Sequence, residues 1–253
     1  MSQKRKYKNL LIVLTSLFLM GVTAIYFVFF SPIKKNRLYY SDFGIYIPSG
    51  YNIHGIDVSH YQRGINWELV KSMKKQNIQI QFAFIKATES NYKVDAFFFR
   101  NWKGSKENGI IRGAYHYFDA SNDAKQQAIL FSEVVRLKKG DLPPVIDIES
   151  TNGVSDEVLC KKLQTCLTFT EQHFGIKPII YTYADFYEDH LAGKFDNYPL
   201  WIAHYTPKKS PRVKRQWHFW QHHETGRVNG IKGLVDFNVF NGDTTAFENL
   251  LLN

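Results

Sequence analysis

Eight short apolar runs recur between residues 54 and 240, and this recurrence constrains the fold more than any other feature of the chain. Each run has the length of a buried strand and is bounded by polar residues. We predict strands at HGIDVS (54–59), IQFAFIKAT (80–88), IRGAYHYF (111–118), PPVIDIE (143–149), KPIIYTY (177–183), PLWIAHY (199–205), HFWQHH (218–223) and GLVDFNVF (233–240).

Amphipathic stretches of helix length separate the early runs. We predict helices at 66–77, 95–108, 122–138 and 155–174. Ser155, followed by two acidic residues, marks the start of the fourth helix, because hydroxyl caps and acids favour helix N-termini. Asn122 or Ser121 is expected to cap the third. After residue 184 the connections are less helical, and 206–216 is a loop.

Strands alternating with helices indicate an α/β fold with a parallel sheet that closes into a modified (β/α)8, TIM-like barrel. The domain is short for eight complete repeats, so we expect reduced helices in its second half. An open doubly wound sheet is the alternative.

The N-terminal segment differs from the rest of the chain. Residues 1–9 are basic, and residues 10–30 form an uncharged apolar run. A helix of about 20 such residues spans a bilayer core. We therefore predict a short cytoplasmic N-terminus (1–9), a single transmembrane anchor (10–30), a juxtamembrane linker (31–51) and a folded domain (52–253). A cleaved signal peptide or a buried core helix is the alternative for 10–30.

The formal net charge of +9 comes mostly from the region beside this apolar run. Residues 1–37 hold seven of the 32 Lys and Arg residues and none of the 23 Asp and Glu residues, which leaves 25 bases against 23 acids. A nearly balanced domain does not indicate a nucleic-acid partner.

The two cysteines, Cys160 and Cys166, both fall in the predicted helix 155–174. Their separation corresponds to about 9 Å of helical rise, beyond the roughly 7 Å that a disulfide allows between Cα atoms. We expect structural thiols and no disulfide between them. The histidines lack a metal-ligand spacing, so no metal site is expected.

Asp147 and Glu149 stand at the end of an otherwise apolar strand. An i,i+2 spacing puts both side chains on one face, with Cα atoms about 6.5–7 Å apart. Crowded carboxylates raise each other's pKa, so one can hold a proton near neutral pH. A protonated acid beside an ionised one can cleave a glycosidic bond.

A lone D-x-E has other interpretations: it can cap a helix, pair with a lysine or bind a hard metal ion. Asp57 and Asp236 lie in two further predicted strands. Because active sites of β/α barrels gather at one end of the barrel, four acids meeting there favour catalysis over stability.

Aromatic residues lie on or near the same strand ends, and sugar rings stack on aromatic faces through their C–H groups. An alternative role for any one of them is barrel core or wall. Together with the polar residues Glu89 and Gln221, the expected substrate contacts are Tyr115, Tyr117, Tyr181, Tyr183, Trp201 and Tyr205.

The ordered motifs GIDVSHYQRGINW, FAFIKATES, GAYHYF, PPVIDIES, IIYTY, LWIAHY, FWQH and GLVDFNVF resemble those of the glycoside hydrolase family 25 lysozymes, the Chalaropsis-type muramidases. The resemblance covers about residues 53–241. It implies a modified β/α barrel that hydrolyses the β-1,4 bond from N-acetylmuramic acid to N-acetylglucosamine in peptidoglycan, without a cofactor.

The resemblance also assigns roles to the acids. Glu149 matches the family's general acid and Asp147 its partner carboxylate, while Asp57 and Asp236 match the other two acids of the pocket. We favour assistance from the substrate's 2-acetamido group, oriented by Asp147, because two carboxylates on one strand are poorly placed to flank the bond from opposite sides.

This chain departs from the family pattern at two loops. Ser90 stands where the family often has Gly, and Arg63 precedes Gly64. The apolar run 10–30 departs from the commonly secreted form. It predicts a membrane-bound protein with a monomeric catalytic domain on the periplasmic or extracellular side. A catalytically silent glycan-binding protein and a metal-dependent hydrolase are the alternative functions.

Overall fold

The computed structural model describes residues 15–17, 19–21, 37–205 and 210–253. The chain divides into two units, Met1–Lys35 and Asn36–Asn253. In the first unit, residues 15–17 and 19–21 are helical. Within the described parts of the chain, no helix has the length and apolar character needed to cross a membrane. Most of the predicted anchor (10–30) and the first part of the linker lie outside the described residues.

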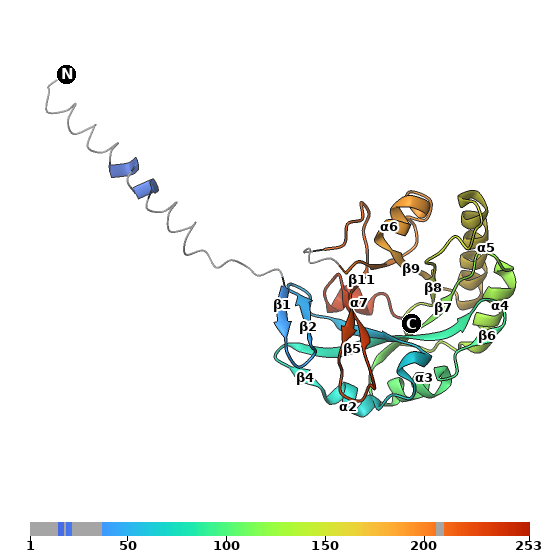
Figure 1. Cartoon of the computed structure of the whole chain (residues 1–253), viewed down its shortest axis with the longest axis horizontal. Coiled ribbons are helices and arrows are strands. Elements are labelled where there is room, and N and C mark those ends of the chain that lie inside the picture. The colour runs from blue at the N-terminus through green and yellow to red at the C-terminus, as the bar shows by residue number, and fades with distance from the viewer. Residues whose placement is uncertain (1–14, 18, 22–36, 206–209) are drawn as a thin grey trace, which may run out of the picture. The chain divides into compact units, whose positions relative to one another are not determined.

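A closed barrel of eight strands forms the second unit (Figure 1). Each predicted apolar run contributes one strand, and pairing of β3 with β5 closes the ring. In chain order the barrel strands are β3 (His54–Val58), β5 (Ile78–Glu89), β7 (Ile111–Tyr117), β8 (Val145–Asp147), β9 (Ile179–Tyr183), β10 (Leu200–Ala203), β11 (Phe219–Gly226) and β12 (Val235–Phe240). The short strands β4 (Lys74–Lys75) and β6 (Lys93–Val94) pair only with β5.

The prediction of a wholly parallel sheet is wrong for the last strand. β12 pairs antiparallel with both β11 and β3, whereas the other barrel strands pair in parallel. The β11–β12 connection runs only from residue 227 to 234, and a parallel crossover needs a dozen or more residues. The start of β12 therefore lies at the same end of the barrel as the ends of the other strands.

The four predicted helices are present, each shorter than expected. They are α2 (Trp67–Ser72), α3 (Phe98–Glu107), α4 (Ala124–Val134) and α5 (Asp156–Phe174). The prediction of reduced helices in the second half is confirmed. There the structure has α6 (Ala184–Phe186), the π-helical turn η2 (Tyr187–Leu191) and α7 (Thr244–Glu248).

Helix caps explain where two of these helices begin. Ser155 caps α5 as predicted, its Oγ accepting a hydrogen bond from Val158 N. The predicted cap of α4 is wrong: Asp123 caps it, through Gln126 N at 2.8 Å. Ser121 and Asn122 donate hydrogen bonds to Asp119 instead. On α5, Cys160 and Cys166 are free thiols.

A β-hairpin precedes the barrel within the segment predicted as a linker. β1 (Arg37–Tyr40) and β2 (Ile45–Pro48) pair antiparallel. Phe43 at the turn is buried and packs edge-on against Phe237 of β12, with ring centroids 5.4 Å apart. This part of the linker therefore belongs to the barrel's packed unit.

Large rings fill the barrel interior. Phe82, Phe84 and Phe219 are fully buried and in mutual ring contact. Glycine makes room for them, because a Cβ at Gly55 would lie 2.4 Å from the Phe82 ring. A second apolar layer lies between the barrel and its helices. The filled interior leaves the end that carries the acids as the place for a site.

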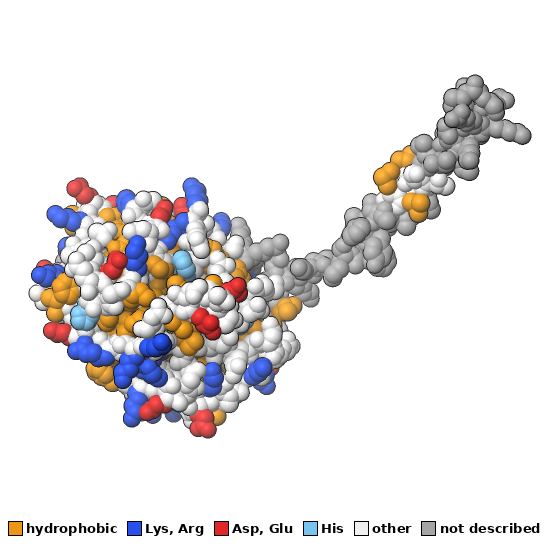
Figure 2. Space-filling model, turned by 180° about the vertical axis from the view of Figure 1, so that it is seen from behind, with side chains coloured by type: hydrophobic (Ala, Val, Ile, Leu, Met, Phe, Trp, Pro, Cys, Tyr) orange, Lys and Arg blue, Asp and Glu red, His pale blue; other side chains and the backbone are white. Residues whose placement is uncertain are grey.

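On the face seen in Figure 2, charged side chains of both signs are interspersed.

Candidate active site

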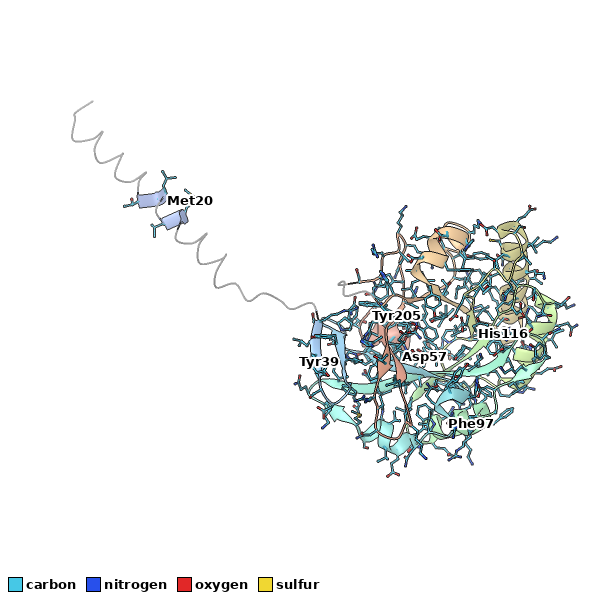
Figure 3. The ribbon with its side chains drawn as sticks, viewed as in Figure 1. Met20, Tyr39, Asp57, Phe97, His116 and Tyr205 are labelled. Atoms are coloured by element: carbon cyan, nitrogen blue, oxygen red, sulfur yellow. The ribbon has the colours of Figure 1, made fainter. Side chains whose placement is uncertain are left out.

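One cavity of about 240 Å³ gathers nearly all the residues that the sequence singled out. Asp57, Asp147, Glu149 and Asp236 line it, from β3, the end of β8 and the start of β12. The six predicted aromatic residues and Gln221 line it too. Figure 3 labels two members of this lining, Asp57 and Tyr205.

The Asp147–Glu149 pair sits where β8 ends. Asp147 lies between Tyr117 of β7 and Tyr181 of β9 in the sheet register. It is 5% exposed, and its Oδ1 is buried without a hydrogen-bond partner among the described residues. Glu149 lies just beyond the strand and is half-buried. The pair thus has one deeply buried and one more accessible carboxyl group.

Burial raises the pKa of both carboxyl groups. For Asp147 the pKa lies well above its usual range, because burial is aided by the charge of Glu149. The pKa of Glu149 is also raised by burial, while hydrogen bonding with Asp147 opposes the rise. Two such groups titrate as a pair. The deeper burial of Asp147 favours the shared proton on that carboxyl group over Glu149 in the free protein.

Asp57 and Asp236 form the second pair of acids. Burial raises the pKa of Asp57 to about 6, against hydrogen bonds from Asn238 and Gln221 that lower it. The pKa of Asp236 is raised to about 9 by burial and then by the charges of Asp57 and Glu224. Of this pair, Asp57 therefore ionises first as the pH rises, and Asp236 keeps its proton to higher pH.

Both polar atoms of the Gln221 side-chain amide form hydrogen bonds with other side chains of the protein. Its Oε1 accepts hydrogen bonds from the hydroxyls of Tyr181 (2.8 Å) and Tyr205 (2.6 Å). Its Nε2 donates to Asp57 Oδ2 at 2.8 Å. These contacts order the site internally, and a direct contact of Gln221 with substrate stays a prediction.

The aromatic residues divide into a floor and walls. Trp201 is buried and stacks on Phe84, with centroids 4.3 Å apart, so the alternative of a barrel-core residue holds for its ring. Tyr115 and Tyr181 are also buried in the floor. The more accessible walls are Tyr117, Tyr183 and Tyr205.

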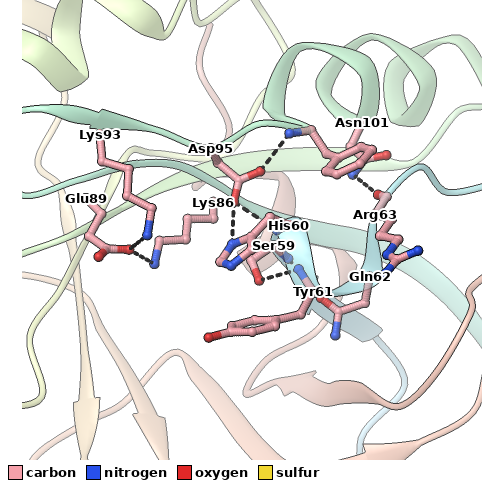
Figure 4. Close-up of polar contacts among 11 residues, drawn as sticks. Ser59, His60, Tyr61, Gln62, Arg63, Lys86, Glu89, Lys93, Asp95 and Asn101 are labelled. Atoms are coloured by element: carbon pink, nitrogen blue, oxygen red, sulfur yellow. Dashed lines mark hydrogen bonds and ion pairs between the residues drawn. The ribbon is translucent and has the colours of Figure 1, made fainter.

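Glu89 is the one predicted site residue that the structure leaves outside the cavity lining. Its Oε2 binds the ammonium groups of Lys86 at 2.7 Å and Lys93 at 3.0 Å (Figure 4). The ammonium of Lys86 also lies 4.6 Å from the centre of the Tyr117 ring. Glu89 thus fixes a cation at the cavity wall, and its contact with substrate stays a prediction.

Four lining residues were absent from the predicted site: Ser59, Tyr61, Lys86 and Glu224. Lys86 stands at a predicted strand end, so its position was a usable signal. Glu224 lies beyond the predicted strand 218–223, because β11 continues through two register shifts to Gly226. The sequence carried no signal for that irregular extension.

Metal ligation finds no support in the described ranges, where no group of three or more His, Cys, Asp or Glu side chains could hold an ion. His116 is buried between Thr88 Oγ1 (2.8 Å) and Gln127 Oε1 (3.2 Å). Burial lowers the pKa of His116 to about 4.

A larger hollow, about 730 Å³, lies between α2, α3 and the loop at Gly230, and the four acids are not in its lining.

Comparison with known proteins agrees with this geometry. The model of the family "Glycosyl hydrolases family 25" matches residues 56–231, which include Asp57, Asp147 and Glu149 and end before Asp236. The chain therefore belongs to glycoside hydrolase family 25, and it is a glycoside hydrolase of the lysozyme type.

Individual relatives extend over most of the chain. Lysozyme M1 of Streptomyces globisporus is 36% identical over 220 residues, covering 79% of this chain and 72% of that protein. YegX of Escherichia coli (strain K12) is 47% identical over 224 residues, covering 88% and 80%. The solved structure of a family 25 glycosyl hydrolase from Bacillus anthracis superposes with a TM-score of 0.74 at 33% identity, covering 81% of this chain and 96% of that one.

Proposed function

We propose that the protein is a muramidase that hydrolyses the β-1,4 bond from N-acetylmuramic acid to N-acetylglucosamine in peptidoglycan. The observation that carries this proposal is the buried, unpartnered Oδ1 of Asp147 beside the more accessible Glu149. A buried acceptor without a partner is costly, and an amide N–H of a bound 2-acetamido group would satisfy it.

Each acid then has a distinct role. Glu149 protonates the glycosidic oxygen as its bond to C1 breaks. The acetamido oxygen attacks C1, while Asp147 accepts the acetamido N–H and stabilises the positive charge that develops. Water then opens the cyclic intermediate, giving one proton back to Glu149 and a hydroxyl to C1.

Substrate binding adjusts the protonation of the pair. In the free protein burial favours the proton on Asp147. A hydrogen bond donated to Asp147 favours its ionised form, so the acetamido group would move the proton towards Glu149. Ionised Asp57 adds negative potential near C1, and neutral Asp236 can donate a hydrogen bond to the sugar.

The direct test incubates the full-length protein, purified in mild detergent, with purified peptidoglycan in EDTA. Released fragments are reduced with borohydride and identified by mass spectrometry. Fragments ending in reduced muramic acid support the proposal. Fragments ending in reduced glucosamine overturn the bond assignment, and a folded protein that binds peptidoglycan without releasing fragments is the silent binding protein instead.

Glu149→Gln tests the general acid. We expect a loss of about 10²–10⁴-fold in turnover, the usual contribution of a general acid. The melting temperature should be no lower than that of the wild type, because burial raises the pKa of Glu149 and makes its charge costly in the folded state. Glu248→Gln, an exposed glutamate on α7, makes the same chemical change as a control. Near-normal turnover of Glu149→Gln would show that another group supplies the proton.

We further propose that residues 10–30 anchor the protein and hold the catalytic domain on the periplasmic or extracellular side. The support is the uncharged apolar run between basic flanks. Carbonate extraction of membranes, protease accessibility of the domain and N-terminal sequencing test it. A mature N-terminus beyond residue 30 would show a cleaved signal peptide instead.

A further inference from the structure

Two hydrogen bonds connect Trp201, Asn238 and Asp57 across the barrel. The indole Nε1–H of Trp201 on β10 donates to Asn238 Oδ1 on β12 at 2.8 Å. Asn238 Nδ2 donates to Asp57 Oδ2 on β3 at 2.7 Å. Trp201 is 2% exposed, Asn238 0% and Asp57 6%, so bulk water is excluded from these contacts.

The direction of this chain of bonds is fixed by chemistry. An indole N–H can only donate, whereas an amide has one accepting oxygen and one donating nitrogen. Trp201 therefore turns the oxygen of Asn238 towards itself and the amide N–H₂ towards Asp57. Asp57 therefore accepts a hydrogen bond from an amide whose orientation is set by Trp201 and not by the charge of the Asp57 carboxyl group.

Gln221 offers a contrast at the same oxygen. Its Nε2 also donates to Asp57 Oδ2, and its Oε1 faces the hydroxyls of Tyr181 and Tyr205. A tyrosine hydroxyl both donates and accepts, so those contacts do not impose one orientation on the Gln221 amide. Trp201 is thus the group that sets the polarity of the network.

Donors aimed at a buried carboxylate favour its ionised form. Without them, burial would drive Asp57 towards neutrality, since removing a charge from water is costly. The two amide donors oppose the effect of burial on Asp57 in a cavity that holds four other carboxyl groups, those of Asp147, Glu149, Glu224 and Asp236.

We propose that Trp201 and Asn238 are positioning residues that fix the orientation of the Asp57 carboxylate and stabilise its charge. This inference rests on the proposed function, in which an ionised Asp57 supports the reaction. It gives Trp201 a role through its N–H in place of sugar stacking, and it adds Asn238 to the functional residues.

Trp201→Phe tests this role, because it retains an aromatic ring against Phe84 and removes the N–H. Trp220→Phe is the matched control: Trp220 is also buried on a neighbouring strand, and its Nε1 donates to the carbonyl of His204 at 2.8 Å. Both variants lose the five-membered ring of an indole and the hydrogen bond that its N–H donates, but only the Trp201 bond orients a donor to Asp57.

The measurement is a ¹³C NMR titration of the aspartate carboxyl groups in the full-length protein, with Asp57 assigned from Asp57→Asn. Without the Trp201 N–H the Asn238 amide is free to turn its donor away from Asp57, so we expect Trp201→Phe to raise the titration midpoint of Asp57 by about one unit. Trp220→Phe should leave that midpoint unchanged. In Trp201→Phe the acidic limb of the kcat/KM pH profile should move to higher pH than in the wild type, in step with the raised Asp57 midpoint.

An unchanged Asp57 midpoint in folded Trp201→Phe overturns the proposal. If that variant fails to fold, Trp201→benzothienylalanine, which replaces the N–H by sulfur in a ring of the same shape, gives the same decision. The titration needs no turnover. If the Asp57 midpoint shifts in a protein that releases no fragments from peptidoglycan, the result would support the positioning role and overturn the proposed muramidase activity.

Discussion

Asp57 on β3 and Asp236 on β12 lie directly opposite each other as Cα partners of an antiparallel pair. Side chains in such a position have Cβ atoms about 4.5–5.5 Å apart, and like charges there are destabilising. The protein responds by keeping one of the two neutral, as the raised pKa values of Asp57 (about 6) and Asp236 (about 9) indicate.

This pairing predicts that stability falls as the pH rises. An acid whose folded pKa lies above its unfolded value binds more protons when folded, so the free energy of unfolding declines between the two values. For Asp236 the decline extends from about pH 4 to about pH 9. Asp236→Asn should therefore gain melting temperature over wild type between pH 5 and pH 9. Exposed Asp185→Asn is the control, and a gain that does not grow with pH would contradict the prediction.

Glu224 should contribute to the raised pKa of Asp236, because its charge acts on that carboxyl group across the cavity. We expect Glu224→Gln to lower the pKa of Asp236 by about a few tenths of a unit, as expected for one exposed neighbouring charge. A ¹³C titration measures this change. Glu248→Gln, on α7, should leave the titration curve of Asp236 in place.

The departure at Arg63 carries backbone strain. Arg63 has φ +56° and ψ −144°, a region that costs residues with a side chain about 1–3 kcal/mol. The loop holds it there, since Asn101 Nδ2 donates to the Arg63 carbonyl at 2.8 Å (Figure 4). Arg63→Gly should relieve more strain than the glycine's entropy costs, with a net gain of about 1 kcal/mol. Differential scanning calorimetry would show it, and Arg63→Ala, which keeps a Cβ, should show no gain.

A buried ion pair should be costly to break. Arg112 donates to both carboxylate oxygens of Asp141, at 2.9 and 3.1 Å, with both side chains about 95% buried. Asp141→Asn leaves the guanidinium without its charge partner, so we expect a loss of about 3–5 kcal/mol. The half-exposed pair Lys75–Asp42 provides the control, because Asp42→Asn should cost less than about 1 kcal/mol. Urea unfolding of the two variants compares them, and equal losses would refute the distinction.

Local sequence was sufficient for much of this fold. The eight apolar runs gave eight barrel strands, because a run of strand length bounded by polar residues has few other ways to be buried. Asp147 and Glu149 were also predicted to lie close together, and both line the cavity, although β8 ends at Asp147 and Glu149 lies just beyond it. The helices of the first half were predicted with ends one to several residues too long. The choice of cap among neighbouring residues such as Ser121, Asn122 and Asp123 is decided by contacts, because Asp119 engages the first two and leaves Asp123 as the cap.

Other features depended on the way the chain closes. Asp236 is the second residue of β12, so in a parallel strand it would lie at the far end of the barrel from Glu149. The short β11–β12 connection reverses the strand and brings Asp236 opposite Asp57. The same reversal sets Asn238 beside Trp201. The sequence by itself determined which residues form buried strands and that two carboxylates stand at the end of one of them. Only the tertiary structure decided which carboxylates face each other and which donors hold them, because strand direction and ring closure are set by connections and packing between residues far apart in the chain.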